Sequence, residues 1–113
     1  MNVRASAVSY PEAMDETYSF SAVLWIWAEA KGSWHFVTLP TALSDEIDER
    51  VGDAARGFGS VPVEASLGPT TWRTSIFPSK SAAAYVLPVK AAVRSAAAIG
   101  EGDEVEVRLR VRV

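Results

Sequence analysis

Residues 85–113 read YVLPVKAAVRSAAAIGEGDEVEVRLRVRV, and this stretch decides the fold. From residue 104 onward, valine or leucine alternates with glutamate or arginine without interruption. Successive side chains of a strand point to opposite faces, so the alternation predicts a strand with one buried and one solvated face. The preceding residues 100–103 include glycine and aspartate, which tolerate the backbone angles of a tight turn.

A short helix is predicted between Pro88 and that turn. Proline is tolerated in the first turn of a helix, where a missing N–H costs no hydrogen bond, and Gly100 is typical of a helix end. The stripe expected to face the core consists of Val89, Ala92, Val93, Ala96 and Ile99. The whole stretch therefore predicts a strand, a helix, a turn and a longer strand.

Residues 34–67 repeat this layout more loosely. Leu-Pro occurs at residues 39–40 and again at residues 87–88, and alternating strands begin at Val61 and again at Val105. Two such halves, each with an uncovered apolar face, would close into one barrel with helices at its openings. The expected fold is mainly β with two short helices, a small double-split β-barrel built from two pseudo-repeats of strand-strand-helix-strand.

The domain boundaries follow from the two halves. Residues 1–16 are polar and are expected to form an N-terminal tail, and residues 17–113 a single β-barrel domain with pseudo-repeats 17–67 and 70–113. The strands expected before the closing one are residues 17–30, 34–39, 61–67, 70–77 and 83–87.

A first helix is expected after Pro40. Thr41 or Ser44 would cap it, because a side-chain oxygen there accepts a free N–H of the first turn. Its buried stripe is expected to consist of Leu43, Ile47, Val51 and Ala54, followed by Gly57 and Gly59 at its end.

Length and composition set the limits for function. The length of 113 residues predicts one domain, and a net charge of −3 gives no general attraction to nucleic acid or to an anionic membrane. The chain has no cysteine, and its one histidine is His35, so no metal and no cofactor are expected. No segment resembles a signal peptide or a membrane span, which predicts a cytoplasmic protein.

The run LPVKAAVRSAAAIGEGDEVEV resembles the swapped-hairpin motif of AbrB-type transcription regulators and antitoxins. The residues that fill this motif are Leu87, Pro88, Arg94, Ile99, Gly102, Asp103, Val105 and Val107. The resemblance implies basic residues on paired loops and hairpins that reach DNA.

A second resemblance covers nearly all of the chain from Tyr18 onward. It rests on W-x-F-V-x-L-P at residues 34–40, T-S-I-F-P at 74–78, L-P-V-K-A-x-V-R at 87–94 and Gly-Asp at 102–103. These segments resemble a family of bacterial domains of unknown function, numbered nineteen-oh-five. The resemblance implies a double-split β-barrel completed within one chain, and it implies no particular activity.

Four residues are candidates for binding a small anion: Arg73, Ser75, Lys90 and Arg94. Lys90 and Arg94 are four positions apart and share a helix face, close to the predicted helix start. The two strand residues would complete the site if that strand lies beside the helix. The alternative is a solvated basic face, or an ion pair between Arg94 and Asp103.

The four tryptophans are a second feature of the sequence. Trp34 and Trp72 are candidates for lining a ligand pocket at the mouth of the barrel. Large aromatic rings more often belong to a core, and at least two of the four are expected there.

Three functions are compatible with these residues. The favoured one is a cytoplasmic accessory module, a monomer or weak dimer, that binds an unknown small anionic ligand or a protein partner. The first alternative is a DNA-binding regulator of the AbrB-like type, although residues 1–57 hold nine acidic and only four basic side chains. The second alternative is an enzyme of unknown class. No catalytic residue is assigned, because His35 has no serine, cysteine or carboxylate near it in the sequence.

Overall fold

The structure is a computed structural model that describes residues 17–29, 32–52 and 59–112. Its strands are β1 (Thr17–Val23), β2 (Trp25–Glu29), β3 (Gly32–Thr38), β4 (Val61–Leu67), β5 (Thr70–Ser79), β6 (Ala84–Pro88) and β7 (Glu104–Val111). The helices are α1 (Thr41–Val51), between β3 and β4, and α2 (Ala91–Ala97), between β6 and β7.

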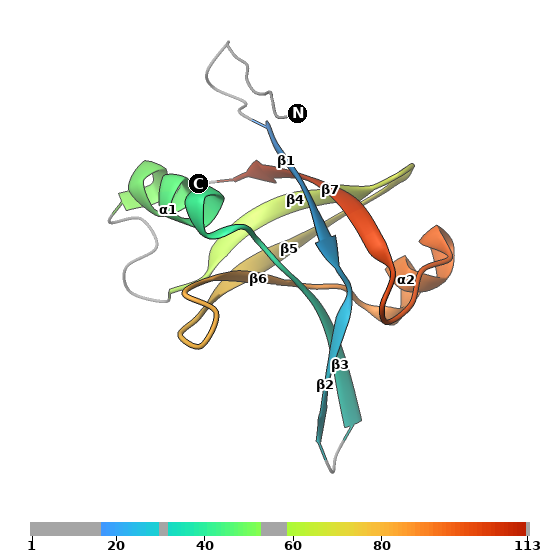
Figure 1. Cartoon of the computed structure of the whole chain (residues 1–113). Coiled ribbons are helices and arrows are strands. Elements are labelled where there is room, and N and C mark those ends of the chain that lie inside the picture. The colour runs from blue at the N-terminus through green and yellow to red at the C-terminus, as the bar shows by residue number, and fades with distance from the viewer. Residues whose placement is uncertain (1–16, 30–31, 53–58, 113) are drawn as a thin grey trace.

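The strands form one curled antiparallel sheet of seven strands in the order β1-β7-β4-β5-β6-β3-β2 (Figure 1). The two outermost strands, β1 and β2, are consecutive in the chain and are separated only by Leu24. Because both ends of the sheet belong to one chain segment, the sheet curls round on itself. The fold is therefore mainly β and barrel-like with two helices, as the sequence predicts.

The order of the strands in the sheet relates the two halves of the chain to each other. The β3–β6 ladder joins corresponding strands of the two halves, and so does the β4–β7 ladder. The segment β1–β2 neighbours β7 and β3, just as β5 neighbours β4 and β6. Exchanging the halves therefore leaves the strand order unchanged, which is the arrangement that two pseudo-repeats would produce.

The core lies inside the curled sheet, and buried and exposed side chains alternate along the strands that form it. Every second residue of β4 is buried, from Val61 to Leu67, and β7 follows the same rule from Val105 to Val111. The largest side chains with almost no exposed surface are Leu24, Leu39, Ile47, Ile76, Leu87 and Leu109. The prediction from alternating sequence is thus confirmed for both strands.

The strand boundaries differ from the prediction in several places; β3 and β6, for example, are shifted by one or two residues. Residues 17–30 do not form one strand, because Leu24 interrupts it. The Leu24 N–H donates to the carbonyl of Asp103 (2.9 Å), and its own carbonyl accepts from the Gly102 N–H (2.9 Å). Strand β5 continues through Pro78 to Ser79, and β7 ends at Val111. The Leu24 break is the important difference, because it redirects the chain from β1 into β2.

Helix α1 follows Pro40 but lacks the predicted cap. Neither Thr41 nor Ser44 makes a capping hydrogen bond. Ser44 lies inside the helix and is buried, where its hydroxyl accepts the backbone N–H of Tyr85 on β6 (3.0 Å). The helix ends at Gly52, in the left-handed region with φ of 49°. The predicted Ala54 and Gly57 lie outside the described residues.

Helix α2 is shorter than predicted. Val93 is its buried residue, and Ala97 and Ile99 pack against the core, whereas Ala92 and Ala96 of the expected stripe are exposed. Its end is set by Ala98, in the left-handed conformation with φ of 59°, and not by Gly100.

Candidate functional site

The hairpin β2–β3 projects from the rest of the sheet as an arm (Figure 1). In its register Trp25 lies opposite Phe36, and Trp27 lies opposite Trp34. Residues directly opposite each other share a face, and so do residues two apart on one strand. All four rings therefore lie on one face of the arm, which we call the aromatic face.

The base of the aromatic face is held in place by specific contacts. The ring centroids of Trp25 and Phe36 lie 5.0 Å apart with planes tilted by 32°. The indole N–H of Trp25 donates to the hydroxyl of Thr38 (2.9 Å). These contacts fix the rings where the arm joins the barrel.

The tip of the aromatic face is open to solvent. Trp27 is 50% exposed and Trp34 is 58% exposed, against 37% for Trp25. Within the described chain, no ring contact joins Trp27 to Trp34, and neither indole N–H has a hydrogen-bond acceptor. Both rings thus present their faces and their N–H groups to solvent.

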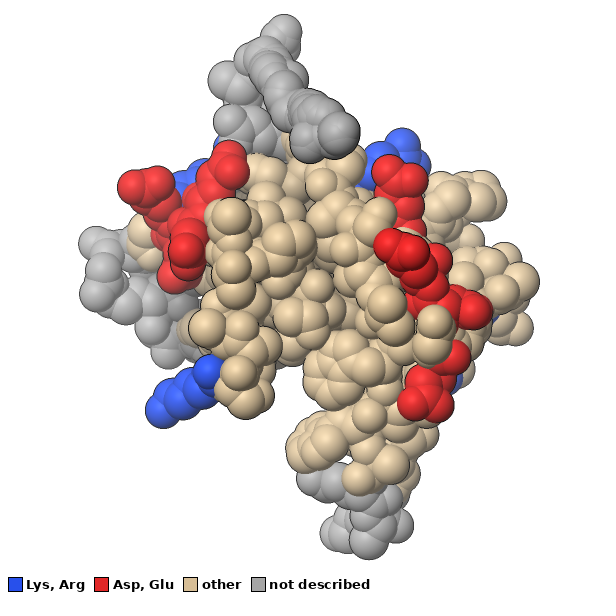
Figure 2. Space-filling model, in the orientation of Figure 1, with Lys and Arg blue, Asp and Glu red and all other residues tan. Residues whose placement is uncertain are grey.

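The arm is also free of charge over most of its length. Residues 25–28 and 32–38 contain no lysine, arginine, aspartate or glutamate. In Figure 2 the described part of the arm is correspondingly tan, whereas acidic residues gather on α1 and along the opposite flank of the molecule. Over residues 25–28 and 32–38 the aromatic face is therefore neutral and apolar, and the charged residues of the hairpin, Glu29 and Lys31, come between these two ranges in the sequence.

The structure separates the two predicted pocket tryptophans. Trp72, on β5, is only 9% exposed and belongs to the core cluster, whereas Trp34 lies near the tip of the arm. The expectation that at least two of the four tryptophans lie in the core is wrong, since Trp72 is the single buried one. The other three belong to an arm that leaves the barrel.

The predicted anion-binding residues lie on two elements. Arg73 and Ser75 lie on the solvated side of β5, where Arg73 is opposite Glu64 in the ladder. Lys90 is exposed just before α2, and the guanidinium of Arg94 donates to the carbonyl of Val89 (3.4 Å). No hydrogen bond or ion pair in the described residues joins the two groups, so the anion site stays a prediction.

The alternative pairing of Arg94 with Asp103 is not formed in the described chain. Asp103 instead accepts the backbone N–H of Gly100 (2.9 Å), which closes the turn before β7. Arg94 lies close enough to His35 to act on its charge. The pKa of His35 is lowered, first by burial and then by Arg94, while Glu101 opposes the shift.

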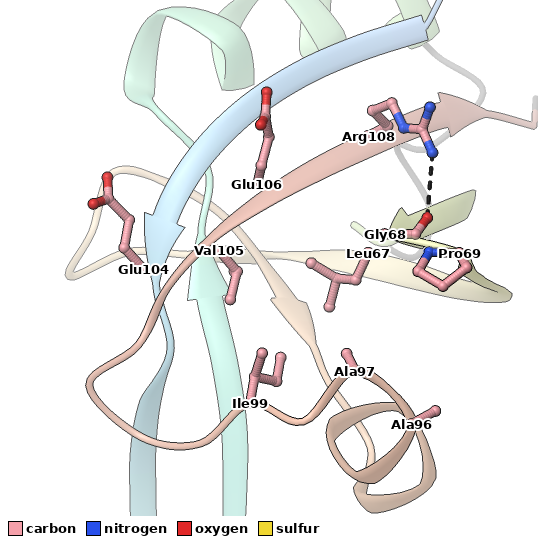
Figure 3. A pocket seen from close by; sticks show the side chains of 10 residues that line it. All are labelled: Leu67, Gly68, Pro69, Ala96, Ala97, Ile99, Glu104, Val105, Glu106 and Arg108. Atoms are coloured by element: carbon pink, nitrogen blue, oxygen red, sulfur yellow. Dashed lines mark hydrogen bonds between the residues drawn. The ribbon is translucent and has the colours of Figure 1, made fainter.

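A shallow groove of about 580 Å³ lies between the β4–β5 turn, the end of α2 and the start of β7. Leu67, Ile99 and Val105 point into it, as Figure 3 shows. The glutamates at its rim, Glu104 and Glu106, extend from the other side of β7. None of the predicted anion-binding residues lines this groove. Three segments that are distant in the sequence form it together, so no local sequence pattern indicates it.

The family described as a domain of unknown function (DUF1905) matches residues 20–109. The chain belongs to this family. No curated protein matches the chain significantly. The match includes the arm, both helices and most of the sheet, so the aromatic face lies within the DUF1905 domain.

Across the residues that the structure describes, no three histidine or carboxylate side chains come together as a metal site would require. In the same residues, neither helix has the length and hydropathy needed to cross a membrane. The aromatic face and the shallow groove are thus the two surface features with chemistry to consider.

Proposed function

We propose that this DUF1905 domain is a non-catalytic binding module that recognises a partner protein through the aromatic face of its β2–β3 arm. The single observation that carries the proposal is the exposure of Trp27 and Trp34 at the tip of a projecting hairpin. Tryptophan is the residue type most enriched among the side chains that dominate binding energy at protein interfaces.

Two further features support a binding role for the arm. Among the five large hydrophobic side chains exposed in the described chain, three are tryptophans of this arm. Strand β2 also lies at the end of the strand order, so one of its edges has no neighbouring strand in the described sheet. An apolar edge of this kind favours contact with another chain.

The DNA-binding alternative has less support. Its candidate basic residues are Arg73, Lys80, Lys90 and Arg94, together with the outward row Arg108, Arg110 and Arg112 on β7. In that row, Arg110 forms an ion pair with Glu64 (3.0 Å) and Arg108 donates to the carbonyl of Gly68 (3.5 Å). Glu104 and Glu106 lie on the same side of β7 and would repel phosphates. A gel-shift titration at low salt tests this alternative, and retardation of DNA would favour it.

The prediction that the domain binds a small anion is tested by a separate experiment. Titration with phosphate, followed through backbone amide resonances, should shift signals near Lys90 if the predicted residues converge in solution. The absence of shifts there at high phosphate concentration would remove Arg73, Ser75, Lys90 and Arg94 as a site.

The proposed role of the arm is tested by site-specific photo-crosslinking in the natural host. A photoreactive phenylalanine analogue replaces Ser33, an exposed residue beside Trp34 on the arm, in one variant and Arg73, on another exposed surface, in the control. We expect a discrete protein adduct at position 33 and none at position 73. Adducts of equal yield at both positions, or none at position 33, would contradict the proposal.

A further inference from the structure

The tip of the aromatic face offers hydrogen-bond donors without acceptors. An indole has one N–H and no acceptor atom. Within the described chain, the N–H groups of Trp27 and Trp34 have no partner. A ligand that matches this surface offers hydrogen-bond acceptors to the indole N–H groups. It has few N–H or O–H groups of its own that would need an acceptor from the protein.

The rings themselves are available for stacking or packing. The Trp25 ring is already engaged with Phe36, but Trp27 and Trp34 make no ring contact with each other in the described residues. They are direct neighbours across the hairpin, and the side chains of such a pair start about 5 Å apart. A flat apolar group can therefore pack on either ring.

Charge excludes several classes of ligand. The sequence of the arm from residue 25 to residue 38 holds one lysine, Lys31, and one glutamate, Glu29, so its formal charge is zero, and His35 faces away from the aromatic face. Single-stranded nucleic acids also stack on aromatic rings, but they require basic residues along the phosphate backbone. A neutral ligand fits this surface better than a phosphate or carboxylate.

The exposed area sets the size of the ligand. With about 250 Å² on a fully exposed tryptophan, the open parts of the three indoles amount to roughly 350 Å². A stable contact between folded proteins, including a second copy of this chain, buries about 800 Å² on each partner. The aromatic face is therefore suited to a short segment.

These properties together describe a proline-rich segment. Building on the proposed function, we propose that the aromatic face binds a short proline-rich segment of a partner in the polyproline II conformation. Proline has no N–H, so all its carbonyls are free acceptors for the two indole N–H groups, and its ring packs on the indole faces. Because polyproline II is already ordered before binding, a small contact suffices.

The test uses the full chain labelled with ¹⁵N and a blocked decaproline peptide. We expect the indole N–H resonances of Trp27 and Trp34 to shift until saturation, while that of buried Trp72 does not move. Trp34→Ala and Trp27→Ala should each raise the Kd at least tenfold. Phe77→Ala, which removes an aromatic ring on β5 that is 44% exposed, should leave the Kd within twofold. The exposed positions of these residues make folding of the variants straightforward to confirm from their spectra.

A second peptide of equal length, alternating threonine and valine, separates this inference from the proposed function. This peptide favours pairing with the free edge of β2. If it shifts the same indole resonances and decaproline does not, the polyproline inference is overturned and a binding arm still stands. If decaproline binds but Trp34→Ala and Phe77→Ala have equal effects, the assigned site is wrong. If neither peptide binds and position 33 forms no crosslink, the inference and the proposed function both fail.

Discussion

Removal of one hydroxyl group should measure how α1 is attached to the sheet. The phenol of Tyr85, on β6, donates to the Oδ1 atom of Asp48, on α1, over 2.6 Å. Tyr85 is only 5% exposed, whereas Asp48 lies on the exposed side of the helix. Tyr85→Phe keeps the ring in the core and removes this hydrogen bond alone.

The expected cost is moderate. A hydrogen bond to a charged group contributes about 1.5–3 kcal/mol to stability, and the exposure of the carboxylate to water places this one at the lower end. We therefore expect Tyr85→Phe to lower the free energy of unfolding by about 1.5 kcal/mol. For a domain of this size, the loss corresponds to a decrease in Tm of roughly 6 °C.

Urea unfolding of a double-mutant cycle measures the contact directly. Tyr85→Phe is combined with Asp48→Ala, and the coupling energy should be about 1 kcal/mol. The matched control combines Tyr85→Phe with Glu49→Ala, an exposed acidic residue one position further along α1, and should show no coupling. A Tyr85–Asp48 coupling no larger than that of the control would refute the attachment of α1 through this hydrogen bond.

The same variant has a distinct pH dependence. Burial, the hydrogen bond to Asp48 and its negative charge, in that order, raise the pKa of Tyr85 well above its usual value. In the unfolded chain the phenol loses its proton near pH 10, while the folded protein still holds it. The contribution is therefore complete below about pH 10 and declines as the pH rises further. The stability difference between the wild type and Tyr85→Phe should shrink from pH 8 to pH 11, and a constant difference would contradict this assignment.

Three other substitutions, one of them with Thr41→Ala as its control, test the packing and the turns by urea unfolding. Ser44→Ala leaves the buried N–H of Tyr85 without its acceptor and should cost about 1–2 kcal/mol, whereas Thr41→Ala, which removes no cap, should cost less than about 0.5 kcal/mol. Leu24→Ala removes a fully buried side chain at the β1–β2 break and should cost about 3 kcal/mol; a loss below about 1 kcal/mol would mean that the site collapses around the smaller residue. Gly68→Ala places a side chain at φ of 58° with no atom near the new Cβ, so only backbone strain of about 1 kcal/mol is expected, and an unchanged stability would show that the turn relaxes.

The regular parts of the sheet could be predicted from the sequence because their signal is local. The burial of Val105 and Val107 follows from the residues on either side of them. The break at Leu24 does not, because its hydrogen-bond partners, Gly102 and Asp103, are far away in the sequence. Ser44 is similar: its residue type favours a cap, but Tyr85 occupies its hydroxyl in the folded chain.

The candidate site was less predictable than the fold. The alternation of Trp25 and Trp27 correctly indicates a strand, but it is equally consistent with rings that face the core or the solvent. The outcome depends on whether the hairpin lies against the barrel or extends beyond it, and residues 25–36 carry no local signal for this. Trp72 and Trp34 illustrate the difference, because one is buried on β5 and the other is exposed on the arm.

The closure of the sheet by β1 has a consequence for the order of folding. Strand β1 pairs only with β7, and its register joins Thr17 to Arg110, near opposite ends of the described chain. During synthesis β1 leaves the ribosome early and has no partner until β7 follows, with Tyr18 and Phe20 uncovered in the meantime. Contacts between such distant segments form slowly because the intervening loop must first close. We therefore expect the docking of β1 to be a late step of folding, and the nascent chain to be prone to aggregation before it.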